Sequence, residues 1–189
     1  LFVDTFHQTE APHIAQTAAR FLTKAGYYIH VVHQRACGGR PQFSKVLLED
    51  AQQTAAASLT YFEPYLDLDA PIMGLEPSCL LTYVDEVPDL FPTDVRAQSL
   101  KGRAVLFETF VAQEVSAGKL NHVSFQGKGV QVIYHGHCHQ KALVGTADTV
   151  AALSHAGYAV EALDTACCGL AGRFGYEREH AGIYRTLAE

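Results

Sequence analysis

Alternating runs of apolar and polar positions divide the chain into strands and helices. Short apolar runs rich in branched and aromatic residues predict strands at 1–4, 27–32, 71–75, 130–134 and 158–163. Apolar residues at helical spacing predict helices at 10–25, 43–61, 103–115 and 142–156, and a short helix after residues 76–79. Residues 87–100, which contain Pro88 and Pro92, are expected to form a connection. Strands that alternate with helices predict an α/β fold with mainly parallel strands.

The pattern of the first part of the chain returns after 131 residues. Residues 22–41 align with residues 153–172 without a gap, and six of the twenty positions are identical. The alignment superposes the expected helix-ending glycines, Gly26 and Gly157, and also places His7 on Cys138. We therefore expect two βαβ-type halves related by a pseudo-twofold axis. Residues 1–100 would form the first half, residues 101–189 a linker helix and the second half, and both would join in one compact unit.

The cysteines follow predicted strands. Cys37 comes after the strand at 27–32, Cys79 after 71–75, Cys138 after 130–134, and the adjacent pair Cys167 and Cys168 after 158–163. The carboxyl ends of parallel strands meet at one edge of a sheet, where such folds bind ligands. The cysteine loops are therefore expected to lie together at this edge.

Composition and charge exclude several functions. The chain has 189 residues, of which 48% are apolar and 18% charged, as in an ordinary soluble globular protein. Its formal charge of −6 and scattered basic residues argue against a nucleic-acid partner. We expect no membrane span, because no stretch approaches 18 consecutive apolar residues. The odd number of cysteines, five, favours free thiols in a reducing, cytoplasmic compartment.

Three interpretations of the cysteines remain open on the residues alone. They are inert packing residues, ligands of a metal, or a thiol–disulfide pair formed by Cys167 and Cys168. A helix N-terminus stabilises an anion by roughly 0.3–1 kcal/mol, less than the 1.36 kcal/mol of one pKa unit. That is too little to keep several neighbouring thiols ionised, whereas a bound cation deprotonates them. We therefore favour a metal, with either an iron–sulfur centre or a structural zinc ion bound by these thiols.

The segment "HGHCHQK" at 135–141 surrounds Cys138 with three histidines. His135, His137 and His139 are expected to donate hydrogen bonds to the metal-bound sulfur. Direct ligation and a purely structural role are the alternatives. If the strand continued through this segment, the histidines would lie on one side and Cys138 on the other.

Four motifs resemble the cysteine-rich CCG domain: "ACGGRP", "EPSC", "HGHCHQKAL" and "CCGLAGRFGYE". This domain type occurs in the C-terminal iron–sulfur region of FAD-linked D-2-hydroxyacid dehydrogenases. It also occurs in iron–sulfur subunits of glycolate oxidase and anaerobic glycerol-3-phosphate dehydrogenase. The resemblance implies an electron-transfer domain that binds a four-iron (4Fe-4S) cluster. The ligands it implies are Cys37, Cys79, Cys138, Cys167 and Cys168.

The resemblance also implies what lies outside this chain. FAD on an upstream domain of the same or an associated chain would oxidise a D-2-hydroxy acid of the lactate, glycolate or 2-hydroxyglutarate class. Electrons would then reach a quinone or another acceptor, at the inner face of the cytoplasmic membrane if the protein associates with it peripherally. No residue of this chain is expected to be catalytic.

The chain departs from the motif in its first loop, where the family has two adjacent cysteines and this chain has Cys37 alone. Gly38 replaces the second cysteine if Arg40 and Pro41 set the register, and Ala36 replaces the first if the internal repeat does. We therefore expect the second half to be the stronger ligand donor. The chain opens without Met, so we expect a piece of a longer polypeptide, in which the cluster is incomplete, absent or replaced by zinc.

Overall fold

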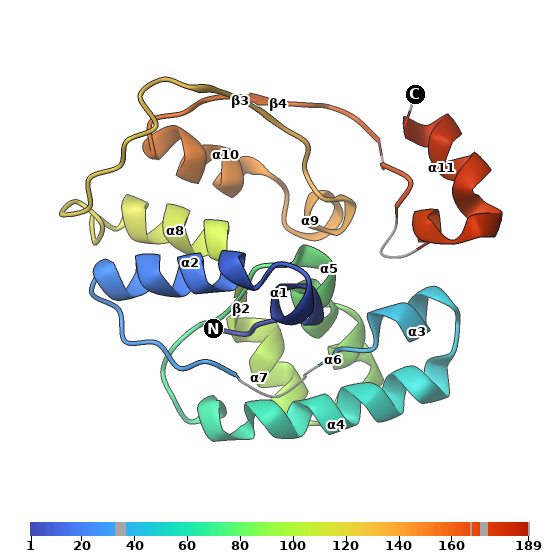
Figure 1. The fold of residues 1–189 in the computed structure, drawn as a ribbon. Helices are drawn as coiled ribbons and strands as arrows, with labels where there is room; N and C mark the ends of the chain where they lie inside the picture. Colours follow the sequence, from blue (N-terminus) through green and yellow to red (C-terminus); the bar gives the residue numbers. More distant parts are fainter. Residues whose placement is uncertain (33–36, 167, 171–173, 189) are drawn as a thin grey trace.

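A computed structural model describes residues 1–32, 37–166, 168–170 and 174–188 (Figure 1). The strands are β1 (Ile72–Gly74), β2 (Ala104–Leu106), β3 (Gln131–Tyr134) and β4 (Ala159–Ala162). The first-half helices are α1 (Thr5–Thr9), α2 (Pro12–Lys24), α3 (Arg40–Ser44), α4 (Leu48–Leu66), α5 (Pro77–Leu80), α6 (Glu86–Leu90) and α7 (Val95–Arg103). They are followed by α8 (Phe107–Ser116), α9 (Cys138–Leu143), α10 (Ala147–His155) and α11 (Ala181–Ala188). Short 3₁₀ turns occupy Leu81–Tyr83, Phe174–Tyr176 and Arg178–His180.

The strands pair in parallel, in agreement with the predicted α/β class. β1 pairs with β2, and β3 pairs with β4. Phe2 forms a parallel bridge with Val32, and its N–H donates to the carbonyl of Met73 at 2.7 Å. The first segment of the chain therefore lies between residues 30–32 and β1. The pseudo-twofold relation between the halves stays a prediction.

Two predicted strands, 1–4 and 27–32, are reduced to this single bridge. Only two backbone hydrogen bonds join them, from the Leu1 amino group to the His30 carbonyl and from the Val32 N–H to the Leu1 carbonyl. The pairing ends early because Asp4 caps α1, accepting hydrogen bonds from the N–H groups of Phe6 and His7. The chain thus turns into a helix after three extended residues.

The helix boundaries also differ from the prediction. The helix expected at 43–61 is split into α3 and α4, because Val46 has a left-handed backbone with φ of 59°. The connection expected at 87–100 is wrong, since α6 and α7 form there. Pro88 is tolerated in the first turn of α6, where a helix needs no N–H donor, and Asp94 caps α7. The helix expected at 142–156 is interrupted at Gly145, which has φ of 75° and separates α9 from α10.

The predicted helix stops at Gly26 and Gly157 are confirmed. Both glycines have left-handed backbones, with φ of 92° and 91°. In both halves the next residue donates its N–H to the carbonyl five residues earlier, from Tyr27 to Leu22 and from Tyr158 to Leu153. His7 lies in the first turn of α1, which begins at Thr5, and Cys138 is the first residue of α9, so the equivalence of these two residues stays a prediction.

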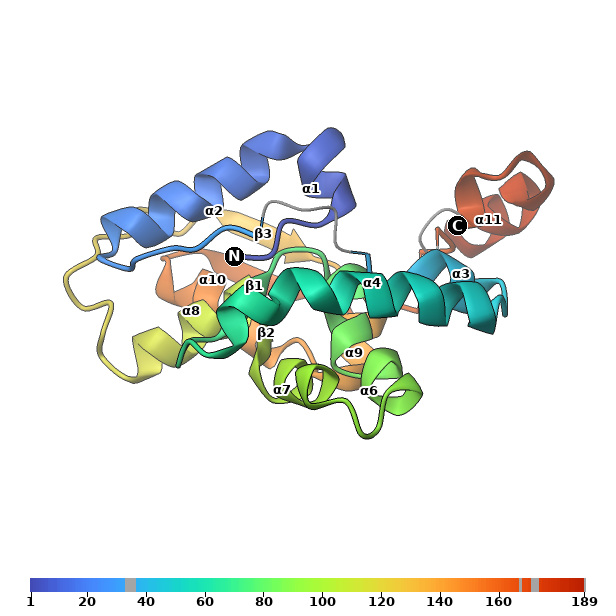
Figure 2. The same ribbon diagram turned by 90° about the horizontal axis from the view of Figure 1, so that it is seen from below.

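The first-half strands are covered on both faces, as parallel strands usually are. Ala55, Leu59 and Phe62 of α4 pack with Phe2 on one face. Met73 of β1 faces the other way, where Leu22 of α2 and Phe110 of α8 cover it. The view in Figure 2 shows α4 crossing in front of β1 and β2, with α2 beyond them.

The second half is covered on one face only. α10 packs against both α8 and β4, so it separates β3 and β4 from the rest of the molecule. β3 and β4 form the outermost layer in Figure 1, and Ile133 is 68% exposed there. Among the described residues, no apolar side chain after Leu120 is buried. No helix in the described part of the chain combines the length and the apolar character needed to cross a bilayer.

Candidate metal centre

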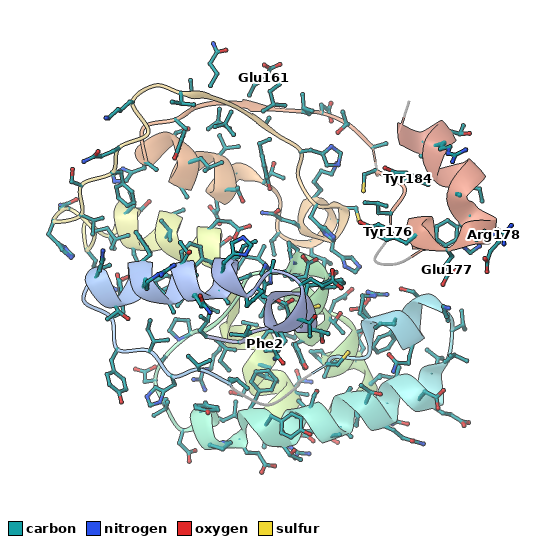
Figure 3. The ribbon with its side chains drawn as sticks, viewed as in Figure 1. Phe2, Glu161, Tyr176, Glu177, Arg178 and Tyr184 are labelled. Atoms are coloured by element: carbon teal, nitrogen blue, oxygen red, sulfur yellow. The ribbon has the colours of Figure 1, made fainter. Side chains whose placement is uncertain are left out.

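Cys138 and Cys168 line the same cavity, beyond the carboxyl ends of β3 and β4. The cavity has a volume of about 540 Å³, and both cysteines are exposed. Glu76 and Tyr176 also line it, and Figure 3 shows Tyr176 on the C-terminal segment where that segment faces α9. The structure thus brings together two thiols that are far apart in the sequence, at the sheet edge where the cysteine loops are expected. Their role as ligands stays a prediction.

Cys37 and Cys79 occupy a more buried place. Cys79 lies in α5, whose N-terminus is capped by Glu76. Burial raises the pKa of the Cys79 thiol well above its usual range, and the negative charges of Asp4, Glu76 and Cys37 raise it further. Cys79 does not line the cavity of Cys138, although Glu76 and Ser78, its neighbours on the chain, do.

The fifth candidate ligand, Cys167, lies outside the described residues. Within the described ranges, no three His, Cys, Asp or Glu side chains converge closely enough to hold one metal ion. The donor set still fits soft-metal chemistry, because two exposed thiols share one cavity and α5, which carries a third, packs against α9.

Strand alternation predicts that the three histidines lie on the side opposite Cys138, and this prediction is wrong. The strand ends at Tyr134, and α9 begins at Cys138 with His137 as its N-cap. His135, His137 and Cys138 therefore line the same cavity. Burial lowers the pKa of His137, which favours its neutral form.

Each histidine around Cys138 contacts a different cysteine-bearing segment. His135 Nδ1 lies 2.8 Å from the hydroxyl of Thr165, in the loop that leads to Cys167. His137 Nε2 lies 3.7 Å from the Glu76 carboxylate, at the start of the helix that carries Cys79. His139 Nε2 lies 3.0 Å from Arg40, the first residue of α3, three positions after Cys37. The segment around Cys138 therefore joins the other cysteine-bearing segments.

Arg40 is a link between the two halves. Its guanidinium donates to the Glu86 carboxylate and contacts His139. Because arginine has no acceptor, His139 Nε2 accepts this hydrogen bond, and burial together with the Arg40 charge lowers the pKa of His139.

Gln140, which the sequence does not single out, anchors α9 in the interior. Its side chain is 2% exposed and accepts a hydrogen bond from the Tyr134 hydroxyl at 2.7 Å. Its amide donates to Thr149 at 2.7 Å and to Glu108 at 3.3 Å. Burial raises the pKa of Glu108. A polar network thus fixes the helix that carries Cys138.

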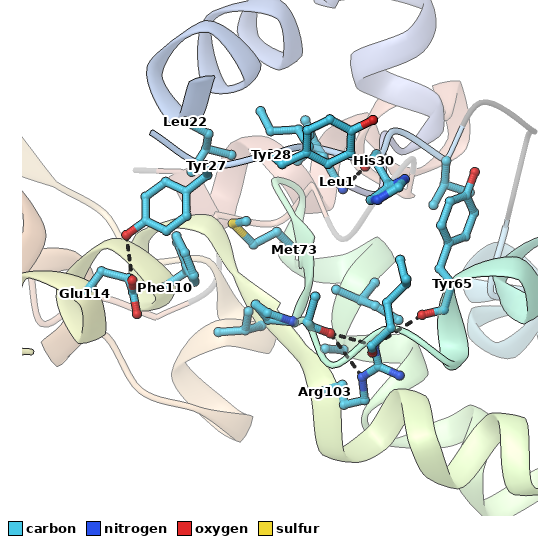
Figure 4. Close-up of a pocket in the computed structure, with 18 of the residues that line it drawn as sticks. Leu1, Leu22, Tyr27, Tyr28, His30, Tyr65, Met73, Arg103, Phe110 and Glu114 are labelled. Atoms are coloured by element: carbon cyan, nitrogen blue, oxygen red, sulfur yellow. Dashed lines mark hydrogen bonds between the residues drawn. The ribbon is translucent and has the colours of Figure 1, made fainter. Parts of the chain in front are cut away.

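A second cavity of about 520 Å³ lies at the amino ends of β1 and β2 (Figure 4). Several of its polar side chains are engaged in hydrogen bonds with one another or with the backbone. Tyr27 donates to Glu114 at 2.5 Å, and burial raises the pKa of Tyr27 to about 12. Arg103 donates to backbone carbonyls at the end of α4, including those of Tyr65 and Leu66. Arg103 thereby holds the end of α4 at this cavity.

Comparison with curated proteins finds dehydrogenase components. The chain is 21% identical over 188 residues to a subunit of the anaerobic glycerol-3-phosphate dehydrogenase of Escherichia coli (strain K12), in a match that covers 94% of this chain and 46% of that protein. It is 27% identical over 177 residues to D-2-hydroxyglutarate dehydrogenase of Pantoea ananatis (strain AJ13355), and 26% over 152 residues to the enzyme of the same name from Escherichia coli (strain K12). These matches cover 87% and 77% of this chain, and 16% and 14% of the two enzymes.

The chain therefore spans about half the length of the first relative and a small part of the others. No family model and no solved structure matches it. The relatives support an oxidoreductase-related role.

Proposed function

We propose that this chain is the iron–sulfur, electron-transfer part of a dehydrogenase. The observation that carries the proposal is the shared cavity of Cys138 and Cys168, two exposed thiols from different loops. Exposed thiols suit a ligand role better than a core role. The similarity to dehydrogenase components gives this site a redox context.

Cys37, Cys79, Cys138, Cys167 and Cys168 would supply the thiolates. An iron–sulfur cluster, when bound, accepts and passes on single electrons. Cys79 keeps its proton until a cation is present, because burial and the neighbouring negative charges disfavour its thiolate. His137 caps α9 and so holds the first residue of that helix, Cys138, at the cavity.

The substrate would be oxidised on a flavin-containing unit, which takes two electrons from the hydroxyl-bearing carbon. The relatives are named for small anionic hydroxy compounds, glycerol-3-phosphate and 2-hydroxyglutarate. We propose a D-2-hydroxy acid as the substrate class, FAD as the flavin, and a quinone or another carrier as the acceptor, in the cytoplasm. The two halves, residues 1–100 and 101–189, would act as one unit.

The test is quantitation of iron, acid-labile sulfide and zinc in the whole protein purified without oxygen. We expect iron and sulfide in matching amounts, a paramagnetic signal on reduction, and loss of most of the iron in a Cys168→Ser variant. Stoichiometric zinc without sulfide would contradict the proposal and indicate a structural zinc domain. So would iron that stays unchanged when Cys168 is replaced.

A further inference from the structure

Lys141 of α9 contacts the backbone of the loop that leads to the adjacent cysteines. Its Nζ lies 2.5 Å from the carbonyl oxygen of Thr165 and 3.4 Å from that of Ala166. A lysine ammonium has three donors and no acceptor, so both carbonyls accept. Hydrogen bonds from a charged donor are stronger than those between neutral groups.

The contact lies where the sheet has already ended. The last hydrogen bond between the strands runs from the Leu163 N–H to the Tyr134 carbonyl at 2.9 Å. Beyond it, Lys141 holds the backbone of Thr165 while His135 holds its hydroxyl. Both side chains come from the segment around Cys138, so this segment positions the loop that carries the second thiol of the cavity.

Gly136 makes room for this arrangement. A Cβ at Gly136 would lie 2.6 Å from Thr146 Cγ2 and 3.3 Å from Lys141 Cγ. Any larger residue would push against the aliphatic part of Lys141, the part of the side chain that carries the ammonium to the loop. Gly136 therefore leaves room for Thr146 and for the aliphatic part of Lys141.

We propose that Lys141 is a positioning residue that fixes residues 164–166 on α9 and so presents the thiol of Cys168 to that of Cys138. The identity of the ligand that the two thiols bind rests on the proposed function. The positioning itself is a property of the chain and can be measured without metal.

The experiment measures how fast dibromobimane, a reagent that fluoresces when both of its arms have reacted, bridges Cys138 and Cys168. It uses the whole metal-free protein in a Cys167→Ser background, with the bridged peptides identified by mass spectrometry. The rate is divided by the alkylation rates of the two thiols with monobromobimane, which removes changes in thiol reactivity. The variants are Lys141→Met, Lys141→Arg and, as a matched control, Lys119→Met, which removes a lysine bonded to Glu114 away from the cavity.

We expect Lys141→Met to slow bridging roughly tenfold, about the effect of losing one exposed hydrogen bond from a charged donor. Lys141→Arg, which keeps the charge and the donors, is expected to bridge within about twofold of the parent rate. Lys119→Met is expected to have no effect. Equal rates in Lys141→Met and its parent would overturn the proposal, as would an arginine variant as slow as the methionine variant.

Lys141→Gln gives the same readout if the methionine variant does not fold. Iron content is measured separately on the same variants. A wild-type protein without iron overturns the proposed function and leaves the bridging result standing. Unchanged bridging overturns the role of Lys141 and leaves iron binding standing.

Discussion

Residues 1–120 and residues 130–188 both pair their strands in parallel, yet different interactions hold the two regions. In the first region the strands are covered on both faces by apolar side chains, such as Leu59, which is fully buried. In the second region Ile133 is exposed, and the interior contacts of α9 are polar, through Gln140. The thiols follow the same division, with Cys79 half-buried and Cys138 exposed. The first region is therefore a scaffold, and the second carries the accessible thiols.

We expect the largest difference between the two regions when one aliphatic side chain in each is truncated and the free energy of unfolding is compared. Leu59→Ala should lower the free energy of unfolding by about 2–5 kcal/mol, because it leaves a cavity in the packed core. Ile133→Ala should change it by less than about 0.5 kcal/mol, because the side chain is exposed. Urea denaturation of both variants checks this. Similar losses of unfolding free energy in the two variants would contradict the distinction between the scaffold of residues 1–120 and the second region.

The polar anchor of the second region is expected to be the next largest effect. Gln140→Ala leaves the Tyr134 hydroxyl without its acceptor and removes one hydrogen bond each from Thr149 and Glu108, which should cost about 1–3 kcal/mol. Gln131→Ala, at an exposed position of β3, is the matched control and should cost less than about 0.5 kcal/mol. Equal denaturation midpoints for the two variants would show that the network contributes nothing.

A single buried hydrogen bond in the first region should matter less. The Tyr83 hydroxyl donates to Ser58 at 3.0 Å, and Tyr83 is 1% exposed. Tyr83→Phe should lower the free energy of unfolding by about 1 kcal/mol. Tyr28→Phe, at a side chain that is 88% exposed, should leave it unchanged. A loss at Tyr28 as large as that at Tyr83 would contradict the assignment of Tyr83 to the core.

The smallest expected effect is a pH dependence at the edge of the scaffold. Asp4 accepts a hydrogen bond from His7 Nδ1 at 2.6 Å and raises the pKa of His7 above its ordinary 6.5. The stabilisation is complete below the ordinary pKa and is lost as pH rises through the raised value in the folded protein. The difference in unfolding free energy between wild type and His7→Gln should therefore be larger at about pH 6 than at about pH 8.5. A difference that grows with pH would have the wrong sign.

Local signals in the sequence predict much of the fold. Gly26 and Gly157 end helices where the pattern places them, and the apolar runs at 71–75, 130–134 and 158–163 contain strands. The strand at 1–4 is shortened because Asp4 competes as a helix cap. The pattern misses two helices at 87–100, because Pro88 suits a first helical turn as well as a connection.

The site is predictable in its position and less so in its contacts. The rule that parallel strands end at one edge correctly brings Cys138 and Cys168 together. Strand alternation misplaces the histidines, because the strand ends before them. The roles of Gln140 and Lys141 depend on partners distant in the sequence, Glu108 and Thr165, which local pattern does not reveal.

Hydrogen–deuterium exchange of the whole protein, before and after anaerobic reconstitution with iron and sulfide, tests the central claim most directly. A ligand that binds the folded site stabilises the segments that hold it. We predict slower exchange on reconstitution around residues 135–141 and 160–170, with little change in α4 and β1. Unchanged exchange around residues 135–141 and 160–170, or protection of α4 and β1 as strong as that of these segments, would contradict the proposed metal centre.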